Sequence, residues 1–127
     1  MPKVRVVFYQ EVNGSAPVLD WLDGLPAKAQ DKCLVKIERL RDMGHELRRP
    51  EADFLRDGIY ELRIGLQGIH YRILYFFHGN LAAVLAHGLV KERAVPSKAI
   101  DEAIKRKERF AGNPNAHTYR EERRAKD

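Results

Sequence analysis

Residues 58–90 constrain the fold of this chain more than any other stretch. They contain three apolar runs, at 58–65, 69–78 and 81–90, whose composition is typical of β-strands. The two segments between these runs have three and two residues, too few for a crossover, so consecutive strands must pair as an antiparallel meander. The second and third runs are apolar on both faces, which is typical of central strands. We therefore expect the meander to form the middle of a sheet.

The N-terminal part predicts one strand and two helices. Residues 3–9 alternate in the manner of a strand, and a short helix follows around Trp21. Pro26 opens a longer helix whose apolar residues recur every three or four positions until Gly44 stops it. We expect these helices to form a hairpin packed on the first strand. Residues 46–57 are charged and are expected to be irregular.

The C-terminal part predicts one more helix and then a tail. Pro96 starts an amphipathic segment that ends at Gly112. Residues 113–127 carry four basic and three acidic side chains and few apolar ones, so we expect a polar, disordered tail. The predicted order is β-α-α-β-β-β-α, an α+β fold with a mostly antiparallel sheet, and residues 1–112 form the expected domain.

Composition limits the class of protein further. A chain of 127 residues is the length of one domain, and its one cysteine excludes an internal disulfide or a zinc site built on several thiolates. We expect Cys33 to be a core residue. No apolar run approaches the ~18 residues of a membrane span, and the N-terminus lacks a signal-peptide pattern. A cytoplasmic protein without membrane association is therefore expected.

The chain is basic, with 23 lysines and arginines against 18 acidic residues and a net charge of +5. Such a balance favours a polyanionic partner such as nucleic acid. In the meander, Glu61 and Arg63 share a face of the first strand. Two turns are possible between the first and second meander strands. A three-residue turn pairs Gly65 with Ile69 and would place Arg72 on the opposite, apolar face, where an unpaired guanidinium is costly. We therefore expect a four-residue turn, which pairs Gly65 with His70 and places Arg63 directly opposite Arg72.

Two interpretations of this arginine pair are open. Arginine presents a planar fork that matches phosphate oxygens, so the pair could bind a phosphate group. Alternatively, Glu61 bridges the two arginines in a local ion pair on a solvated face. Lys91 and Arg93 bring further positive charge to the end of the last strand, ahead of the basic final helix in which Lys98 lies.

No metal or cofactor is expected. A metal site could be suggested by three histidines, His70, His78 and His87. Neither carboxylates nor a helical HxxxH spacing accompanies them, so we do not expect one. The chain also lacks a glycine-rich phosphate loop and a dinucleotide-binding fingerprint.

Four segments together resemble the RelE/HigB superfamily of bacterial toxins, in particular its phage-related HigB-like branch. They are PVLDWL at 17–22, GIYELR at 58–63, HYRILYF at 70–76 and HGLVKERAVP at 87–96. The resemblance spans roughly residues 3–110. It implies a RelE-like, microbial-RNase-like fold and a metal-independent mRNA endonuclease that acts on the ribosome and inhibits translation. It also implies a HigA-like antitoxin partner with a helix-turn-helix domain.

The resemblance assigns roles to individual residues. Arg72 matches the phosphate-stabilising arginine, and Lys91 falls where RelE-type toxins place a second active-site arginine. Glu61 and Arg63 fall where the RelE type carries lysines, so Glu61 departs in charge. The expected catalytic set is Arg72, Arg63 and Lys91, the expected RNA-binding residues are Arg93 and Lys98, and the candidate general acids or bases are Glu61, His70 and His87.

Two other functions fit the same residues. A ParE-like member of the superfamily would inhibit DNA gyrase and cut no RNA, and a non-catalytic binding module of the same fold would leave cells unharmed.

Overall fold

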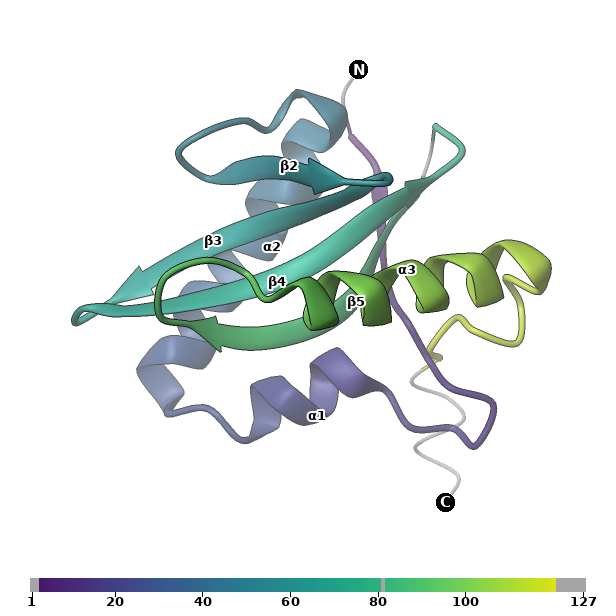
Figure 1. The fold of residues 1–127 in the computed structure, drawn as a ribbon, viewed down its shortest axis with the longest axis horizontal. Helices are drawn as coiled ribbons and strands as arrows, with labels where there is room; N and C mark the ends of the chain where they lie inside the picture. Colours follow the sequence, from purple (N-terminus) through teal and green to yellow (C-terminus); the bar gives the residue numbers. More distant parts are fainter. Residues whose placement is uncertain (1–2, 81, 121–127) are drawn as a thin grey trace.

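The computed structural model describes residues 3–80 and 82–120 and has an α+β fold with a RelE-like arrangement (Figure 1). In chain order the elements are β1 (Arg5–Phe8), α1 (Pro17–Asp23), α2 (Ala27–Met43), the 3-10 helix η1 (Gly44–Glu46), β2 (Ala52–Arg56), β3 (Ile59–Leu66), β4 (Ile69–His78), β5 (Ala82–Lys91) and α3 (Ser97–Gly112). Leu81, expected to begin the last strand, and residues 121–127 of the expected tail lie outside the described residues.

The sheet has five strands in the order β1-β5-β4-β3-β2. Strands β2 to β5 pair antiparallel, which confirms the meander, and β1 adds to β5 in parallel. At the β3–β4 turn Gly65 pairs with His70 and Leu66 with Ile69, as the four-residue turn requires. Gln67 and Gly68 have φ values of 52° and 80° there, as in the turn type that fits the twist of a hairpin.

Strand β2 was not expected, because residues 46–57 were interpreted as irregular. It pairs with β3 from Ala52 opposite Leu62 onward and has a bulge between Phe54 and Arg56. Its five residues include Ala52, which packs in one core cluster, and Leu55, which packs against the other, but so short a segment shows no clear strand period. The Asp-Gly dipeptide at 57–58, which makes the β2–β3 turn with positive φ at both residues, was the available hairpin signal.

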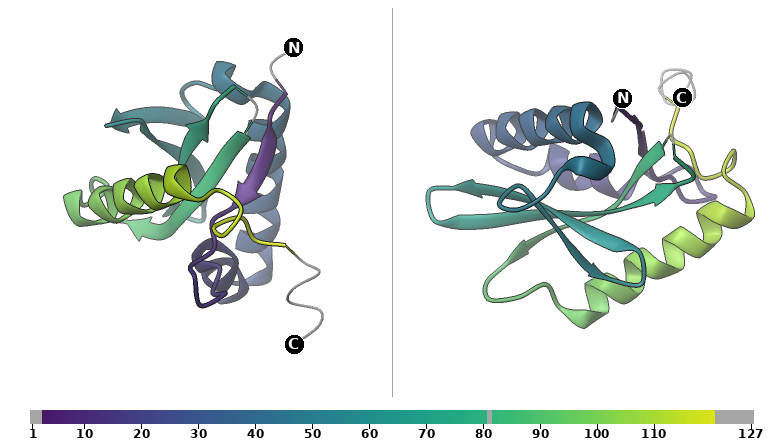
Figure 2. Two further views of the ribbon diagram at one scale, coloured as in Figure 1. Left: turned by 90° about the vertical axis from the view of Figure 1, so that its right-hand side faces the viewer. Right: turned by 90° about the horizontal axis from the view of Figure 1, so that it is seen from above.

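The helices cover both faces of the sheet, with α2 on one side and α3 on the other (Figure 2). Instead of packing on the first strand alone, the N-terminal helices spread across the sheet, α1 against β5 and α2 against β3 and β1. Trp21 of α1 lies so close to β5 that a Cβ at Gly88 would be 2.3 Å from its ring. Cys33 is fully buried in the core on this face, and burial raises the pKa of its thiol to about 11. Its expected core role is thus confirmed.

Helix α3 covers the other face through Ile100, Ala103 and Phe110, which pack with the apolar side chains of β4 and β5. Its N-terminal half is tied to β2, because Arg56 Nη2 lies 2.7 Å from Asp101 Oδ1 and donates to Ser97 Oγ at 3.0 Å. No helix in the described part of the chain is long and apolar enough to cross a membrane.

The segment 113–120 differs from the disordered tail that was expected. It pairs antiparallel with the end of β1, where Gln10 N donates to His117 O and Tyr119 N donates to Phe8 O, each at 2.9 Å. His117 is buried, and its ring stacks on Tyr9 with the centroids 5.2 Å apart. Backbone pairing with an edge strand explains why a segment with few apolar side chains docks. A domain boundary after residue 112 stays a prediction.

Candidate functional site

The predicted register is confirmed, because Arg63 of β3 lies directly opposite Arg72 of β4. Glu61 sits beside both arginines. Its Oε1 accepts a hydrogen bond from Arg72 Nε at 3.1 Å, and its Oε2 lies 3.4 Å from Arg63 Nε. We call Glu61, Arg63 and Arg72 the buried ion triad. The ion pair that one interpretation of the sequence predicted is therefore formed.

The expectation that this ion pair lies on a solvated face was wrong. Glu61 is 3% exposed and Arg72 is 5% exposed. Arg72 also donates from Nη1 to the carbonyl of Tyr71 at 2.8 Å, so its side chain is fixed at two points. Burial lowers the pKa of Arg72 and Arg63 adds to this effect, whereas Glu61 raises it. A guanidinium still keeps its proton at neutral pH, so the buried charges of Glu61 and Arg72 oppose each other and Arg63 adds a second, partly exposed positive charge.

Arg63 is held less firmly than Arg72. Its side chain is 29% exposed, and its buried Nε makes no hydrogen bond within the described residues despite lying near Glu61. The Arg63 guanidinium can therefore turn towards a ligand without breaking a hydrogen bond.

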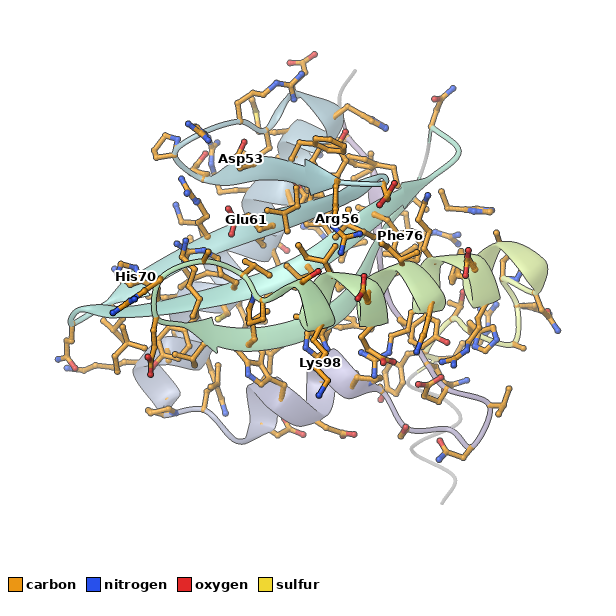
Figure 3. The ribbon with its side chains drawn as sticks, viewed as in Figure 1. Asp53, Arg56, Glu61, His70, Phe76 and Lys98 are labelled. Carbon is orange, nitrogen blue, oxygen red and sulfur yellow. The ribbon has the colours of Figure 1, made fainter. Side chains whose placement is uncertain are left out.

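The triad borders a hollow of about 570 Å³ at the end of the sheet that holds the β3–β4 turn and the C-terminal end of β5. We call it the cationic groove. Figure 3 shows His70 near this end of the sheet, and on the neighbouring strand Lys91 pairs with His70. The residues that line the groove are Lys32, Lys36, Pro50, Glu51, Arg63, Gly65, His70, Arg72, Lys91, Glu92 and Arg93. Positive side chains thus outnumber negative ones on its walls.

One wall comes from residues that the sequence analysis did not single out. Lys32 and Lys36 project from α2, and Glu51 precedes β2. Glu51 accepts from Lys36 Nζ at 3.1 Å and from Arg39 Nη2 at 2.9 Å. These partners, Arg39 foremost, lower the pKa of the Glu51 carboxyl to about 2. The spacing of Lys32 and Lys36 marks one face of a helix, but only the packing of α2 beside β3 brings that face to the groove.

The structure brings six of the predicted site residues together and separates two, His87 and Lys98. The groove is lined by Arg63, His70, Arg72, Lys91 and Arg93. Glu61 lies beneath it in the triad. His87 lies under α3 with Nδ1 at 3.1 Å from Arg106 Nη1, and burial, reinforced by Arg106, lowers its pKa. Lys98 is exposed below α3 and away from Glu61 and His70 (Figure 3).

The groove offers fixed positive charge and one imidazole. Of the described residues lining it, His70 is the only histidine, a side chain that both donates and accepts protons. The arginine and lysine side chains can stabilise negative charge that develops on a phosphate. Within residues 3–80 and 82–120, no three His, Cys, Asp or Glu side chains are grouped so that they could hold a metal ion.

The fold and the groove together define a small, basic α+β protein with a RelE-like sheet and a cationic groove at the end of that sheet. The sequence profile of the family described as Phage derived protein Gp49-like (DUF891) matches residues 20–108, and the chain belongs to this family. The family is of the RelE/HigB toxin type and is associated with toxin–antitoxin systems. No curated protein has a significant sequence match to the chain. The matched span contains every predicted site residue.

Proposed function

We propose that this protein is the toxin of a toxin–antitoxin pair and that it cleaves mRNA in the cationic groove, on the ribosome, thereby inhibiting translation. The observation that carries the proposal is the convergence of Arg63, His70, Arg72 and Lys91 on one groove. These residues come from three strands that lie side by side in the sheet. Family membership supports the toxin assignment independently of this geometry.

The proposed reaction is an internal transfer at the RNA phosphate. The ribose 2′-hydroxyl attacks the adjacent phosphorus while a base takes its proton, and the bond from phosphorus to the 5′ oxygen of the next nucleotide breaks. An acid returns a proton to that leaving oxygen. The products are a 2′,3′-cyclic phosphate and a 5′-hydroxyl. Extra negative charge develops on the phosphate oxygens, and positioned cations stabilise it.

The geometry supports a division of roles. Arg72, fixed by Glu61 and by a carbonyl, supplies immobile positive charge at the base of the groove. Arg63 and Lys91 contact the phosphate more directly, since both are only partly buried. His70 is the side chain that we assign to proton transfer. Glu61 is paired with two guanidinium groups, and His87 lies against Arg106, so neither is available for that role. Glu61 acts as a positioning residue.

The RNA-binding role extends outward from the groove. Arg93 lines the groove beside Glu92, so it is placed to bind a neighbouring phosphate of the same strand. Lys98 lies on the far side of α3, where it can contact only RNA that runs beyond the groove. The proposed partner that neutralises the toxin is a HigA-like antitoxin with a helix-turn-helix domain.

The decisive experiment is expression of the chain without a partner in a bacterial host, with the 5′ ends of cellular RNA mapped over time. We expect growth arrest and new 5′-hydroxyl ends within coding regions. Arg63→Ala, His70→Ala and Lys91→Ala should each reduce the number of new ends, whereas Lys105→Ala, an exposed charge on α3, serves as the matched control. DNA breaks that precede RNA cleavage would indicate a gyrase inhibitor, and unimpaired growth would indicate a binding module. Either result would refute the proposal.

A further inference from the structure

A second hollow lies around β2, at the edge of the sheet, and it differs in character from the cationic groove. Its volume is about 630 Å³, and its walls include His45, Arg48, Arg49, Phe54 and Tyr60. We call it the aromatic groove. It is formed by the 3-10 helix η1, the segment that follows it, and the adjoining parts of β2 and β3.

Aromatic rings are exposed yet braced in this groove. Phe54 projects from the edge strand and is 53% exposed. Its ring meets Tyr60 edge-on with the centroids 5.1 Å apart, and Tyr60 stacks on Tyr75 at 5.4 Å. Nearby, the exposed ring of His45 stacks on Phe77 with the centroids 3.7 Å apart. Rings that are fixed from behind and open in front are suited to stacking against a flat ligand.

Positive charge accompanies the rings. Arg48 donates to the backbone carbonyls of His45 and Leu47, and no carboxylate in the described part of the chain pairs with it. Arg49 is partly neutralised, because its Nη2 lies 2.7 Å from Asp53 Oδ2. The groove therefore combines exposed aromatic faces with the guanidinium of Arg48, whose charge no carboxylate of the described residues offsets.

The two grooves share a wall. Pro50 and Glu51 line the cationic groove, and the flanking residues Arg49 and Ala52 line the aromatic groove. A flexible polyanion that occupies one groove can therefore pass over this short segment into the other.

We propose that the aromatic groove binds single-stranded RNA, with a base stacked on the exposed ring of Phe54, which Tyr60 braces edge-on, and a phosphate held by Arg48. This assignment rests on the proposed function, since it places nucleotides that flank the scissile bond. Stacking on aromatic side chains beside a basic track is the usual way in which proteins hold unpaired nucleotides. The net positive charge and the continuity with the cationic groove favour RNA over a protein partner as the occupant.

The test measures binding of the full-length chain to a labelled 2′-O-methyl uridine dodecamer, which cannot be cleaved, by fluorescence anisotropy. Phe54→Ala should weaken binding by about 5- to 150-fold, the effect of losing one base stack. Phe54→Trp should restore binding because it keeps an aromatic face. Val12→Ala is the matched control, because Val12 is an apolar side chain 85% exposed elsewhere on the surface. Equal melting temperatures would show that all variants are folded.

The outcomes separate this inference from the proposed function. Phe54-dependent binding without RNA cleavage in cells would overturn the proposed function alone. RNA cleavage in cells together with dodecamer binding that Phe54→Ala leaves unchanged would overturn the aromatic groove as an RNA site. If Phe54→Ala instead abolishes co-purification with the antitoxin and leaves RNA binding intact, the groove docks a protein and the inference is wrong.

Discussion

Replacing Glu61 should destabilise the protein more than replacing Arg72, although the two side chains belong to the same ion pair. In Glu61→Ala the guanidiniums of Arg63 and Arg72 remain opposite each other without the carboxylate that lies 3.4 and 3.1 Å from them. In Arg72→Ala the carboxylate keeps Arg63 as a partner. Glu61→Ala therefore leaves unpaired positive charge inside the protein, whereas Arg72→Ala leaves a carboxylate that is still paired.

The magnitudes follow from burial. The Arg72 side chain is 7% exposed, so it cannot turn to water when Glu61 is lost. Leaving such a charge unpaired costs about 3–5 kcal/mol, a large part of the ~5–15 kcal/mol stability of a typical domain. Arg72→Ala removes one buried charge and leaves Glu61 with Arg63 as its partner, which should cost about 1–3 kcal/mol. The double variant should be less destabilised than the sum of the single variants, because Arg63 is then free to turn outward.

Urea unfolding of the parent, both single variants and the double variant measures these differences. Growth inhibition in the same set provides a second readout. Arg72→Ala should fold and yet lose roughly 10²–10³-fold in cleavage rate, by analogy with removal of one transition-state donor. Equal destabilisation by the two single substitutions, or additivity in the double variant, would refute the argument that Glu61 is shared. A folded and fully toxic Arg72→Ala protein would remove Arg72 from the catalytic set.

Three further predictions concern other parts of the molecule. Gly88→Ala should cost about 1–3 kcal/mol and change the fluorescence of Trp21, the only tryptophan, because the new Cβ would lie 2.3 Å from its ring; an unchanged spectrum would contradict this. His117→Ala should cost about 1–3 kcal/mol in thermal unfolding, because it removes a 2.8 Å contact to the Gln10 carbonyl and the ring stack. Burial lowers the pKa of His87, so protonation favours the unfolded state and stability falls as the pH drops below about 6.5; His87→Gln should flatten this slope in urea unfolding between about pH 7 and about pH 5.

The central part of the fold and the geometry of the arginine pair could be predicted because strong local constraints determine them. Short turns leave an antiparallel meander as the only pairing, and a wrong register would have buried Arg72 on an apolar face without a partner. The sequence therefore specified that Arg63 faces Arg72, and the structure agrees. That Glu61 lies close to both follows from the same alternation.

Other features depend on contacts between distant segments, which periodicity does not report. The edge strand β2 has only five residues, too few to show a strand period, and is paired with β3. Lys32 and Lys36 belong to an ordinary exposed helix face until α2 packs beside the groove. The segment 113–120 is polar, yet the free edge of β1 offers it backbone partners. From the sequence alone these features look like a loop, a solvated helix face and a tail, respectively. Contacts with distant segments give each of them a defined place in the fold.

The phosphate-binding and ion-pair interpretations of the arginine pair are compatible in the folded protein. A cation that stabilises a transition state must be fixed before the reaction, since its reorganisation would raise the barrier. Burying Arg72 fixes it, and burial is tolerable only because Glu61 supplies the opposite charge. Glu61 therefore lowers the local positive charge while it holds Arg72 in position. Lys32 and Lys36 of α2 add positive charge on another wall of the groove, where both side chains are at least partly exposed and can contact the proposed RNA substrate.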